Sequence, residues 1–321
     1  CLAMKDSCTK KLVSIVVPCY NEEENVGKLY GEIRKTIEGS HARYNYECIF
    51  IDNASTDSTV QVLREIADTD NRLKIIINTR NFGHLRSPYH AVLQAKGDCI
   101  VLLAADFQDP PSLISDFIHS WEGGEKIVVG IKNKSKENRL MFLVRKAYYK
   151  LIEKYSDIEH ITNFTGFGLY DKSVIDMIRG LEEPYPYFRG LIAETGVECK
   201  KVFFTQPKRD RGKTKNNIYT LFDIAMLGFV NYSKVPLRLS ILTGFIMALM
   251  SLLVAFTYFV YKILFWNSFQ LGLAPLIIGM FLFASMQLIF IGVIGEYVGS
   301  IYTQIKKKPL VYEKERVNFD K

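Results

Sequence analysis

The chain has 321 residues, 48% of them hydrophobic, and a formal net charge of +7 at pH 7. This length allows one sizeable domain and a membrane anchor. The excess of basic residues comes without the aromatic and basic modules of nucleic-acid-binding proteins, and the six cysteines form no CxxC pair or histidine-spaced cluster. These features exclude nucleic acid as a partner and argue against a zinc site or a disulfide framework.

The first 131 residues alternate between buried-strand and helical patterns. Continuous apolar runs rich in β-branched residues predict strands at Leu12–Pro18, Glu47–Asp52, Leu73–Asn78, Cys99–Leu103 and Lys126–Gly130. The stretches between them predict helices over Asn21–Ile37, Asp57–Ala67, Pro88–Lys96 and Pro111–His119. Such alternation predicts an open parallel sheet with helices on both faces.

Beyond residue 131 the pattern changes. We expect a basic amphipathic helix over Asn138–Tyr155, a turn into a short strand over Asn163–Tyr170, and a helix over Asn216–Tyr232. The apolar side chains of this last segment favour a helix in the membrane plane, and an ordinary core helix is the alternative.

Two long apolar stretches follow. Leu239–Tyr261 holds 23 residues without a charge, and the next uncharged run extends from Ile263 to Gly295. In a helix, 23 residues span roughly 34 Å, which is enough for the hydrocarbon core of a bilayer. Basic residues cluster before the first stretch and after the second, whereas the connection carries only Lys262. The positive-inside rule therefore predicts an integral membrane protein with two spans, whose N-terminal domain and C-terminus lie in the cytoplasm.

Carboxylates and amides follow three of the predicted strands, in Val17–Glu22, Asp52–Asp57 and Ala104–Pro111. Open α/β sheets bind their ligands beyond the carboxyl ends of the strands. Capping and turn chemistry alone would explain one such cluster, but three at strand ends favour a polar ligand bound together with a metal.

These motifs also carry a family resemblance. VPCYNEEENV, IDNASTDST, RNFGH and ADFQDPP, in this order, resemble the family 2 glycosyltransferases with a GT-A fold. RDRGKTK, PLRL and GEYVGSIYTQIKKKP resemble the polyprenyl-phosphate glycosyltransferases, a group that includes dolichyl-phosphate mannose synthases and bacterial undecaprenyl-phosphate glucosyltransferases. The resemblance covers nearly the whole chain. It implies an N-terminal tail (1–11), a GT-A domain (12–215), an interfacial helix (216–236), two transmembrane helices (237–304) and a cytoplasmic tail (305–321).

The resemblance assigns roles to individual residues. It implies nucleotide binding by Pro18, Tyr20, Asn21, Glu22, Asp52, Ser55, Asp57, Ala105 and Asp106, with Asp52 at the base. It implies Mg²⁺ or Mn²⁺ binding by Asp106 and Gln108. It implies capture of a lipid phosphate by Arg209, Arg211, Lys213 and Lys215, with Asp106 and Arg209 as the catalytic pair. A divalent cation would neutralise the leaving diphosphate, and an anionic acceptor needs cationic capture rather than a strong base.

The activity implied is transfer of one sugar, with inversion, from a nucleotide-diphosphate sugar to undecaprenyl or dolichyl phosphate at the cytoplasmic face of a bacterial inner membrane. A homo-oligomer, such as a tetramer, is also implied. Two alternatives stay open: a transferase with another lipid-linked acceptor, and a non-catalytic membrane partner that binds nucleotide sugars. A dinucleotide-dependent oxidoreductase is disfavoured, because no GxGxxG follows the first strand.

The sequence departs from the family pattern at several positions. Ala104 replaces the first acid of the Asp-x-Asp motif, and Asn53 replaces the second acid of an Asp-Asp pair. Gly166 lies where the bacterial glucosyltransferases carry an aspartate proposed as base, and Gly168 replaces an arginine of the mannose synthases, which implies a lost phosphate contact. For His84 and Arg189, structural and functional roles both stay open.

Overall fold

A computed structural model describes residues 10–132, 164–181, 183–184, 186–207, 235–265, 273–306 and 308–319. The described residues form two compact units. The first contains the sheet and includes the C-terminal segment 308–319, and the second contains the two long apolar helices.

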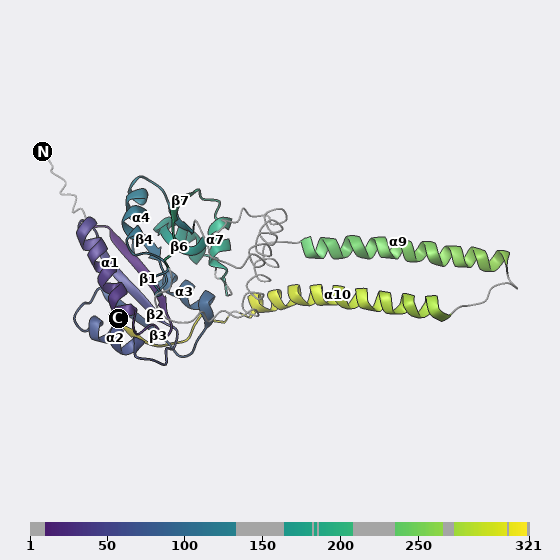
Figure 1. The fold of residues 1–321 in the computed structure, drawn as a ribbon, viewed down its shortest axis with the longest axis horizontal. Coiled ribbons are helices and arrows are strands. Elements are labelled where there is room, and N and C mark those ends of the chain that lie inside the picture. The colour runs from purple at the N-terminus through teal and green to yellow at the C-terminus, as the bar shows by residue number, and fades with distance from the viewer. Residues whose placement is uncertain are drawn as a thin grey trace. The chain divides into compact units, whose positions relative to one another are not determined.

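Eight strands form one sheet in the order β7-β5-β6-β4-β1-β2-β3-β8 (Figure 1). Their bounds are β1 Leu12–Cys19, β2 Asn45–Asp52, β3 Leu73–Asn78, β4 Cys99–Leu102, β5 Ile127–Lys132, β6 Phe164–Asp171, β7 Cys199–Phe204 and β8 Glu313–Val317. Strands β4, β1, β2 and β3 run parallel, and β7 is parallel to β5. The predicted open α/β sheet is confirmed.

The five strands predicted in the first 131 residues run in one direction, and two later strands run against them. β6 lies between β4 and β5 and is antiparallel to both, and β8 is antiparallel to β3 at the sheet edge. Because β6 separates two strands that point the same way, β5 still ends at the same edge of the sheet as β4.

In the described part of the sheet unit, six helices cover the two faces of the sheet. Helices α1 (Val26–Ser40), α2 (Thr59–Ala67) and α4 (Leu113–Glu122) pack on one face, and α3 (Gly83–Gln94), α6 (Lys172–Arg179) and α7 (Phe188–Glu194) on the other. The side chains of β1 alternate between the two cores, with Ile15 and Val17 in the first and Val16 in the second. β1 is therefore buried on both faces, which explains its unbroken apolar run.

Two helices begin elsewhere than predicted. The helix expected from Asn21 begins only at Val26, because Asn21 has a positive φ of 55° and its backbone N–H donates to Ser55. The helix expected from Pro88 begins at Gly83, whose N–H donates to the side-chain oxygen of Asn81 at 2.8 Å.

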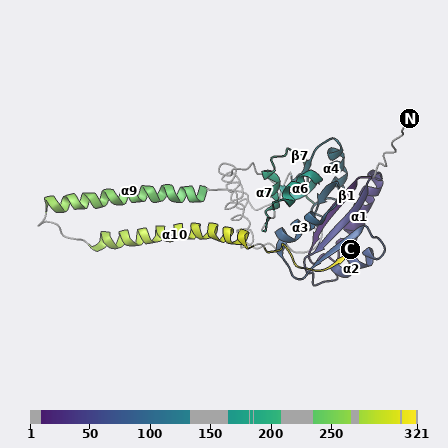
Figure 2. The same cartoon turned by 180° about the vertical axis from the view of Figure 1, so that it is seen from behind.

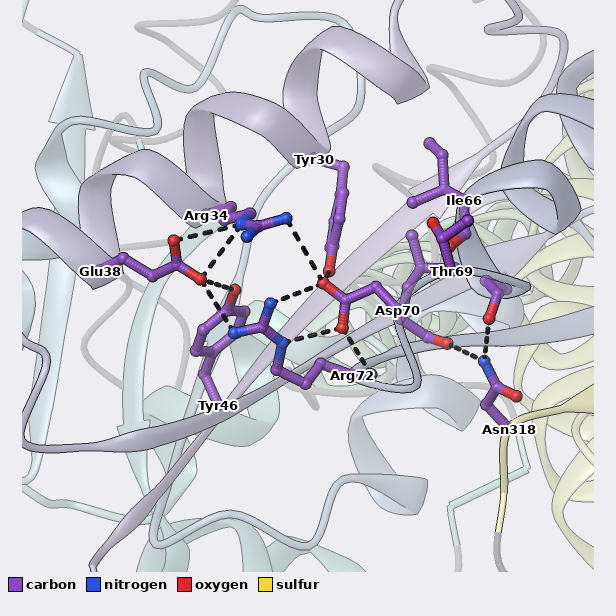
Figure 3. Close-up of polar contacts among 11 residues, drawn as sticks. Tyr30, Arg34, Glu38, Tyr46, Ile66, Thr69, Asp70, Arg72 and Asn318 are labelled. Carbon is purple, nitrogen blue, oxygen red and sulfur yellow. Dashed lines mark hydrogen bonds and ion pairs between the residues drawn. The ribbon is translucent and has the colours of Figure 1, made fainter.

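The C-terminal segment 308–319 belongs to the sheet unit. β8 pairs with β3, the carbonyl oxygen of Tyr312 accepts the Thr79 N–H at 2.9 Å, and Arg86 donates to the carbonyl oxygen of Pro309 at 2.6 Å. Asn318 donates to two carbonyl oxygens at the start of β3 and the end of α2 (Figure 3). Residues 313–317, which were expected to belong to a cytoplasmic tail, thus form the edge strand of the sheet.

A charged network joins α1 to the start of β3 (Figure 3). Arg72 donates to both oxygens of Asp70, at 2.8 and 2.7 Å, and to Glu38 at 2.9 Å. Tyr30 adds a hydroxyl hydrogen bond to Asp70 at 2.7 Å. The Arg72 guanidinium holds the pKa of Asp70 well below its usual range. This network lies at the amino end of β3, so it stabilises the end of the sheet opposite the candidate site.

The second unit contains two helices, α9 (Val235–Leu264) and α10 (Leu273–Ile305), which lie side by side in both views (Figures 1 and 2). Leu239–Leu264 and Gly279–Ile305, with mean hydropathies of 2.4 and 1.8, are long and apolar enough to cross a membrane. The two predicted apolar helices are confirmed. The helices expected over Asn138–Tyr155 and Asn216–Tyr232 lie outside the described residues. The domain boundaries, including the interfacial helix at 216–236, stay predictions.

Candidate active site

The candidate site lies at the edge of the sheet where β4, β1, β2 and β3 have their carboxyl ends. Because these strands are parallel, the loops that follow them meet at this edge. β5 also ends here, and the antiparallel β6 begins here. Three of the four non-glycine residues with positive φ in the described part of the chain, Asn21, Ala54 and Phe107, lie in these loops. Such strained backbone is concentrated at functional sites.

The loops after β1 and β2 are joined by hydrogen bonds. The Asn21 N–H donates to Ser55 Oγ at 2.8 Å, and Asn21 Oδ1 accepts the Thr56 N–H at 2.8 Å. The Glu22 N–H donates to Thr59 Oγ1, also at 2.8 Å. The two loops therefore form one structure, and Asn21 and Ser55 are part of its frame.

Asp52 ends β2 beneath these loops and is fully buried. Its Oδ2 accepts the Ser55 N–H at 3.0 Å, whereas Oδ1 has no hydrogen-bond partner among the described residues. Burial raises the pKa of Asp52, and hydrogen bonds from Ser55 and from the Ala54 backbone oppose this only in part. A buried acceptor without a partner is costly unless a ligand supplies a donor. Asp52 is thus suited to bind an N–H group.

Asp57 has a different environment. Its Oδ1 accepts hydrogen bonds from the Thr59 N–H and hydroxyl, and its Oδ2 accepts the Glu23 N–H at 3.3 Å. Partial burial works to raise its pKa, but these hydrogen bonds outweigh it and the pKa is lowered. Both oxygens are used within the protein, so Asp57 holds the two loops together.

The loop after β4 carries Asp106 and Gln108. The Gln108 N–H donates to Asp106 Oδ1 at 3.2 Å, and Phe107 between them has a φ of 58°. Ala105 is 3% exposed and packs in the core, so only its backbone is available to a nucleotide. The described residues contain no group of three His, Cys, Asp or Glu side chains that could hold a metal. One carboxylate and one amide nevertheless suit Mg²⁺ or Mn²⁺, which take their remaining oxygens from water and phosphate.

Two charged residues that the sequence analysis did not single out lie near Asp106. Asp109 is 6% exposed, and burial raises its pKa to about 6, with the nearby Lys132 opposing. Lys132 ends β5, and burial lowers its pKa although Asp109 and Asp106 oppose this. The only sequence signals were a lysine two residues after a predicted strand and an acid before two prolines. These two residues come from the end of β5 and the loop after β4, two strands that lie on either side of β6, and this strand order was not predicted.

A cavity of about 160 Å³ lies in the same region. Its lining includes Pro18, His84, Ala104, Asp109, Gly166 and Arg189, together with several apolar side chains. Arg189 donates to the carbonyl oxygen of Phe164 at 3.0 Å, which fixes its guanidinium beside the start of β6. His84 is exposed at the first turn of α3. Ala104, which has only a methyl side chain, and Gly166, which has none, both line this cavity.

The structure explains two departures from the family pattern. A Cβ atom at Gly168 would lie 2.4 Å from the carbonyl oxygen of Val128, so no side chain fits there. Gly166 has a φ of 102°, which disfavours any other residue. Strands β5 and β6 approach too closely at Gly168 for an arginine on this backbone, and the loss of its phosphate contact stays a prediction.

The hydrogen bonds at position 53 require an amide side chain. Its Nδ2 donates to Asn81 Oδ1 at 2.9 Å and to the carbonyl oxygen of Gly83 at 3.2 Å, and its Oδ1 accepts the Phe82 N–H at 2.9 Å. A carboxylate cannot donate to these two oxygens, so asparagine joins the loops after β2 and β3 as an aspartate could not. The four residues expected at the lipid phosphate, Arg209, Arg211, Lys213 and Lys215, lie outside the described residues.

Several known proteins are similar to this chain in sequence. The model of the family described as glycosyl transferase family 2 matches residues 14–179. A Bacillus subtilis (strain 168) protein named uncharacterized glycosyltransferase YkcC is 34% identical, and the match covers 92% of this chain and 91% of that protein. The bactoprenol glucosyl transferase of Shigella phage SfII is 30% identical, over 92% of this chain and 96% of that protein. Among solved structures, the Mycobacterium tuberculosis glucosyl-3-phosphoglycerate synthase is 16% identical over 68% of this chain and 76% of that chain, with a TM-score of 0.47.

Proposed function

Because the chain belongs to glycosyl transferase family 2 and is a glycosyltransferase, we propose that it transfers a single sugar from a nucleotide-diphosphate sugar to a polyprenyl phosphate. The observation that carries the donor half of this proposal is the unpartnered Oδ1 of Asp52, buried beneath the joined loops after β1 and β2. The acceptor half is supported by the phage relative named bactoprenol glucosyl transferase and by two helices able to cross a membrane.

The donor nucleotide would bind across the carboxyl ends of β1, β2 and β4. Uracil and guanine each present a ring N–H that can donate to Asp52 Oδ1. Loop backbone around Pro18, Tyr20 and Glu22 would flank the nucleoside, and the diphosphate would lie toward Asp106 and Gln108. A divalent cation bound there would neutralise the charge that develops on the leaving diphosphate. Lys132, which interacts electrostatically with Asp106, and Arg189, which lines the cavity with Asp109, would add cationic charge near the diphosphate.

In the transfer step, a phosphate oxygen of the acceptor attacks the anomeric carbon of the sugar. The bond from that carbon to the diphosphate oxygen breaks, and the nucleoside diphosphate leaves with the electron pair. The acceptor is already an anion at neutral pH, so the step needs no strong general base. The step instead needs cationic groups that hold the acceptor phosphate close to the donor diphosphate, because both are anions. Arg209, with Arg211, Lys213 and Lys215, would supply them at the cytoplasmic face, because arginine binds phosphate bidentately.

The proposal is tested with the purified full chain in lipid nanodiscs. The assay combines labelled UDP- and GDP-sugars, Mg²⁺ or Mn²⁺, and three acceptors: undecaprenyl phosphate, dolichyl phosphate and undecaprenyl diphosphate. We expect one donor to give a labelled lipid with a monophosphate acceptor. Transfer to the diphosphate alone would assign the chain to another lipid-linked acceptor. Nucleotide binding without any labelled lipid would identify a non-catalytic partner.

A further inference from the structure

The loop that carries Asp106 has little regular structure to hold it. It spans residues 103–112 between β4 and α4, and Phe107 within it has a φ of 58°. Positive φ costs free energy in a non-glycine residue, and it persists only where the surroundings fix it. On its amino side the loop is attached by the Leu103 N–H, which donates to the carbonyl oxygen of Val16.

The buried side chain of Asp109 connects two parts of this loop. Its Oδ2 accepts the backbone N–H of Ala104 at 3.1 Å, which closes a ring over the residues between them. The carboxylate is 6% exposed, and Pro110 and Pro111 restrict the backbone directly after it. Asp106 and Gln108 therefore lie inside a ring that one buried side chain closes between residues 104 and 109.

The surroundings of Asp109 link this loop to the rest of the site. Lys132 from the end of β5 interacts electrostatically with Asp109 and with Asp106. Asp109 also lines the cavity together with Ala104 and Arg189. A buried carboxylate is costly, and its presence here is offset by one hydrogen bond and one nearby cation.

We propose that Asp109 is a positioning residue, whose hydrogen bond to the Ala104 N–H sets the conformation of the loop that presents Asp106 to the nucleotide diphosphate. This inference rests on the proposed function for the identity of the ligand. The loop conformation then depends on a hydrogen-bond acceptor in the side chain of residue 109. Asparagine retains an acceptor oxygen at that position, whereas alanine does not.

The test compares Asp109→Ala and Asp109→Asn in the full chain. The matched control is Asp98→Ala, because Asp98 also accepts a backbone N–H, that of Leu12 at 2.8 Å, but at the opposite end of β4. Hydrogen exchange is followed in peptides that cover residues 104–108. Binding of UDP and GDP is measured by calorimetry with and without Mn²⁺.

We expect Asp109→Ala to speed exchange in residues 104–108 and to weaken Mn²⁺-dependent nucleotide binding about tenfold. Asp109→Asn should restore both quantities to near the wild-type values, and Asp98→Ala should change neither. Unchanged exchange or unchanged binding in Asp109→Ala would overturn the inference, as would an Asp109→Asn variant as impaired as the alanine variant. A wild-type chain that binds neither nucleotide would instead contradict the proposed function, and with it the ligand that this inference requires.

Discussion

The backbone N–H of Ser55 donates to Oδ2 of Asp52 at 3.0 Å and leaves Oδ1 of this fully buried carboxylate without a partner among the described residues. The loop after β2 thus orients Asp52 while keeping one acceptor available. In the proposed function that acceptor takes the ring N–H of the donor base.

Asp52→Ala should weaken nucleotide binding. A hydrogen bond to a charged group contributes about 1.5–3 kcal/mol, so we expect the dissociation constant for UDP or GDP to rise by about tenfold or more. Calorimetry on the full chain measures this directly. Asp68→Asn, at an exposed position after α2, serves as the control and should bind as the wild type does. Equal affinities in the two variants would remove Asp52 from the nucleotide site.

Asn53→Asp should loosen the loop after β3. The new carboxylate would face the side-chain oxygen of Asn81 and the carbonyl oxygen of Gly83, where the amide now donates. We expect a loss of about 1–3 kcal/mol in the free energy of unfolding, because two acceptors lose their donor. Chemical denaturation of the two proteins at neutral pH measures the difference. A variant as stable as the wild type would show that these hydrogen bonds are dispensable.

Gly168→Ala should destabilise the junction of β5 and β6. The added Cβ would lie 2.4 Å from the carbonyl oxygen of Val128, and backbone atoms must move to relieve this contact. We expect a loss of at least about 2 kcal/mol. Gly31→Ala is the matched control, because Gly31 lies within helix α1 with no atom within 4 Å of the new Cβ. That variant should be slightly more stable than the wild type. A fully stable Gly168→Ala variant would contradict the close approach of the two strands.

Most of the central sheet could be predicted from the sequence. β1 to β5 are apolar on both faces, and buried parallel strands give a continuous signal that does not depend on their neighbours. β8 gave no such signal, because its sequence EKERV alternates exposed charges along a sheet edge. Its place depends on contacts with β3 and α3 more than 200 residues earlier.

The candidate site was predictable only in part. Strand-end motifs identified Asp52 and Asp106, since the carboxyl ends of parallel strands converge by topology alone. Asp109 follows β4 and Lys132 ends β5, two strands that lie on either side of β6, and this strand order has no local sequence signature. Asn53 looked like a lost acid, and only the two hydrogen bonds that its Nδ2 donates reveal that an amide is needed.

The Asp70 network should make stability fall in acid. Arg72 holds the folded-state pKa of Asp70 below its unfolded value, which is about 4. The contribution of Asp70 is therefore complete at neutral pH and is lost as the pH falls below about 4 toward the folded-state pKa. Asp70→Asn should lower the melting temperature at pH 7, and its gap from the wild type should shrink below pH 4. Thermal unfolding at several pH values measures this gap. A gap that is independent of pH would contradict the stated role of the ion pair.

The most direct test of the whole account is transfer of labelled sugar to undecaprenyl phosphate by the full chain, compared with its Asp106→Asn variant. Asp116→Asn, on the exposed face of α4, is the matched control. The account predicts a labelled polyprenyl-phosphate sugar from the wild type and the control. It predicts a loss of about 100-fold or more in the Asp106 variant with the fold unchanged. Full turnover by Asp106→Asn, or no lipid product from the wild type with any donor of the panel, would contradict it.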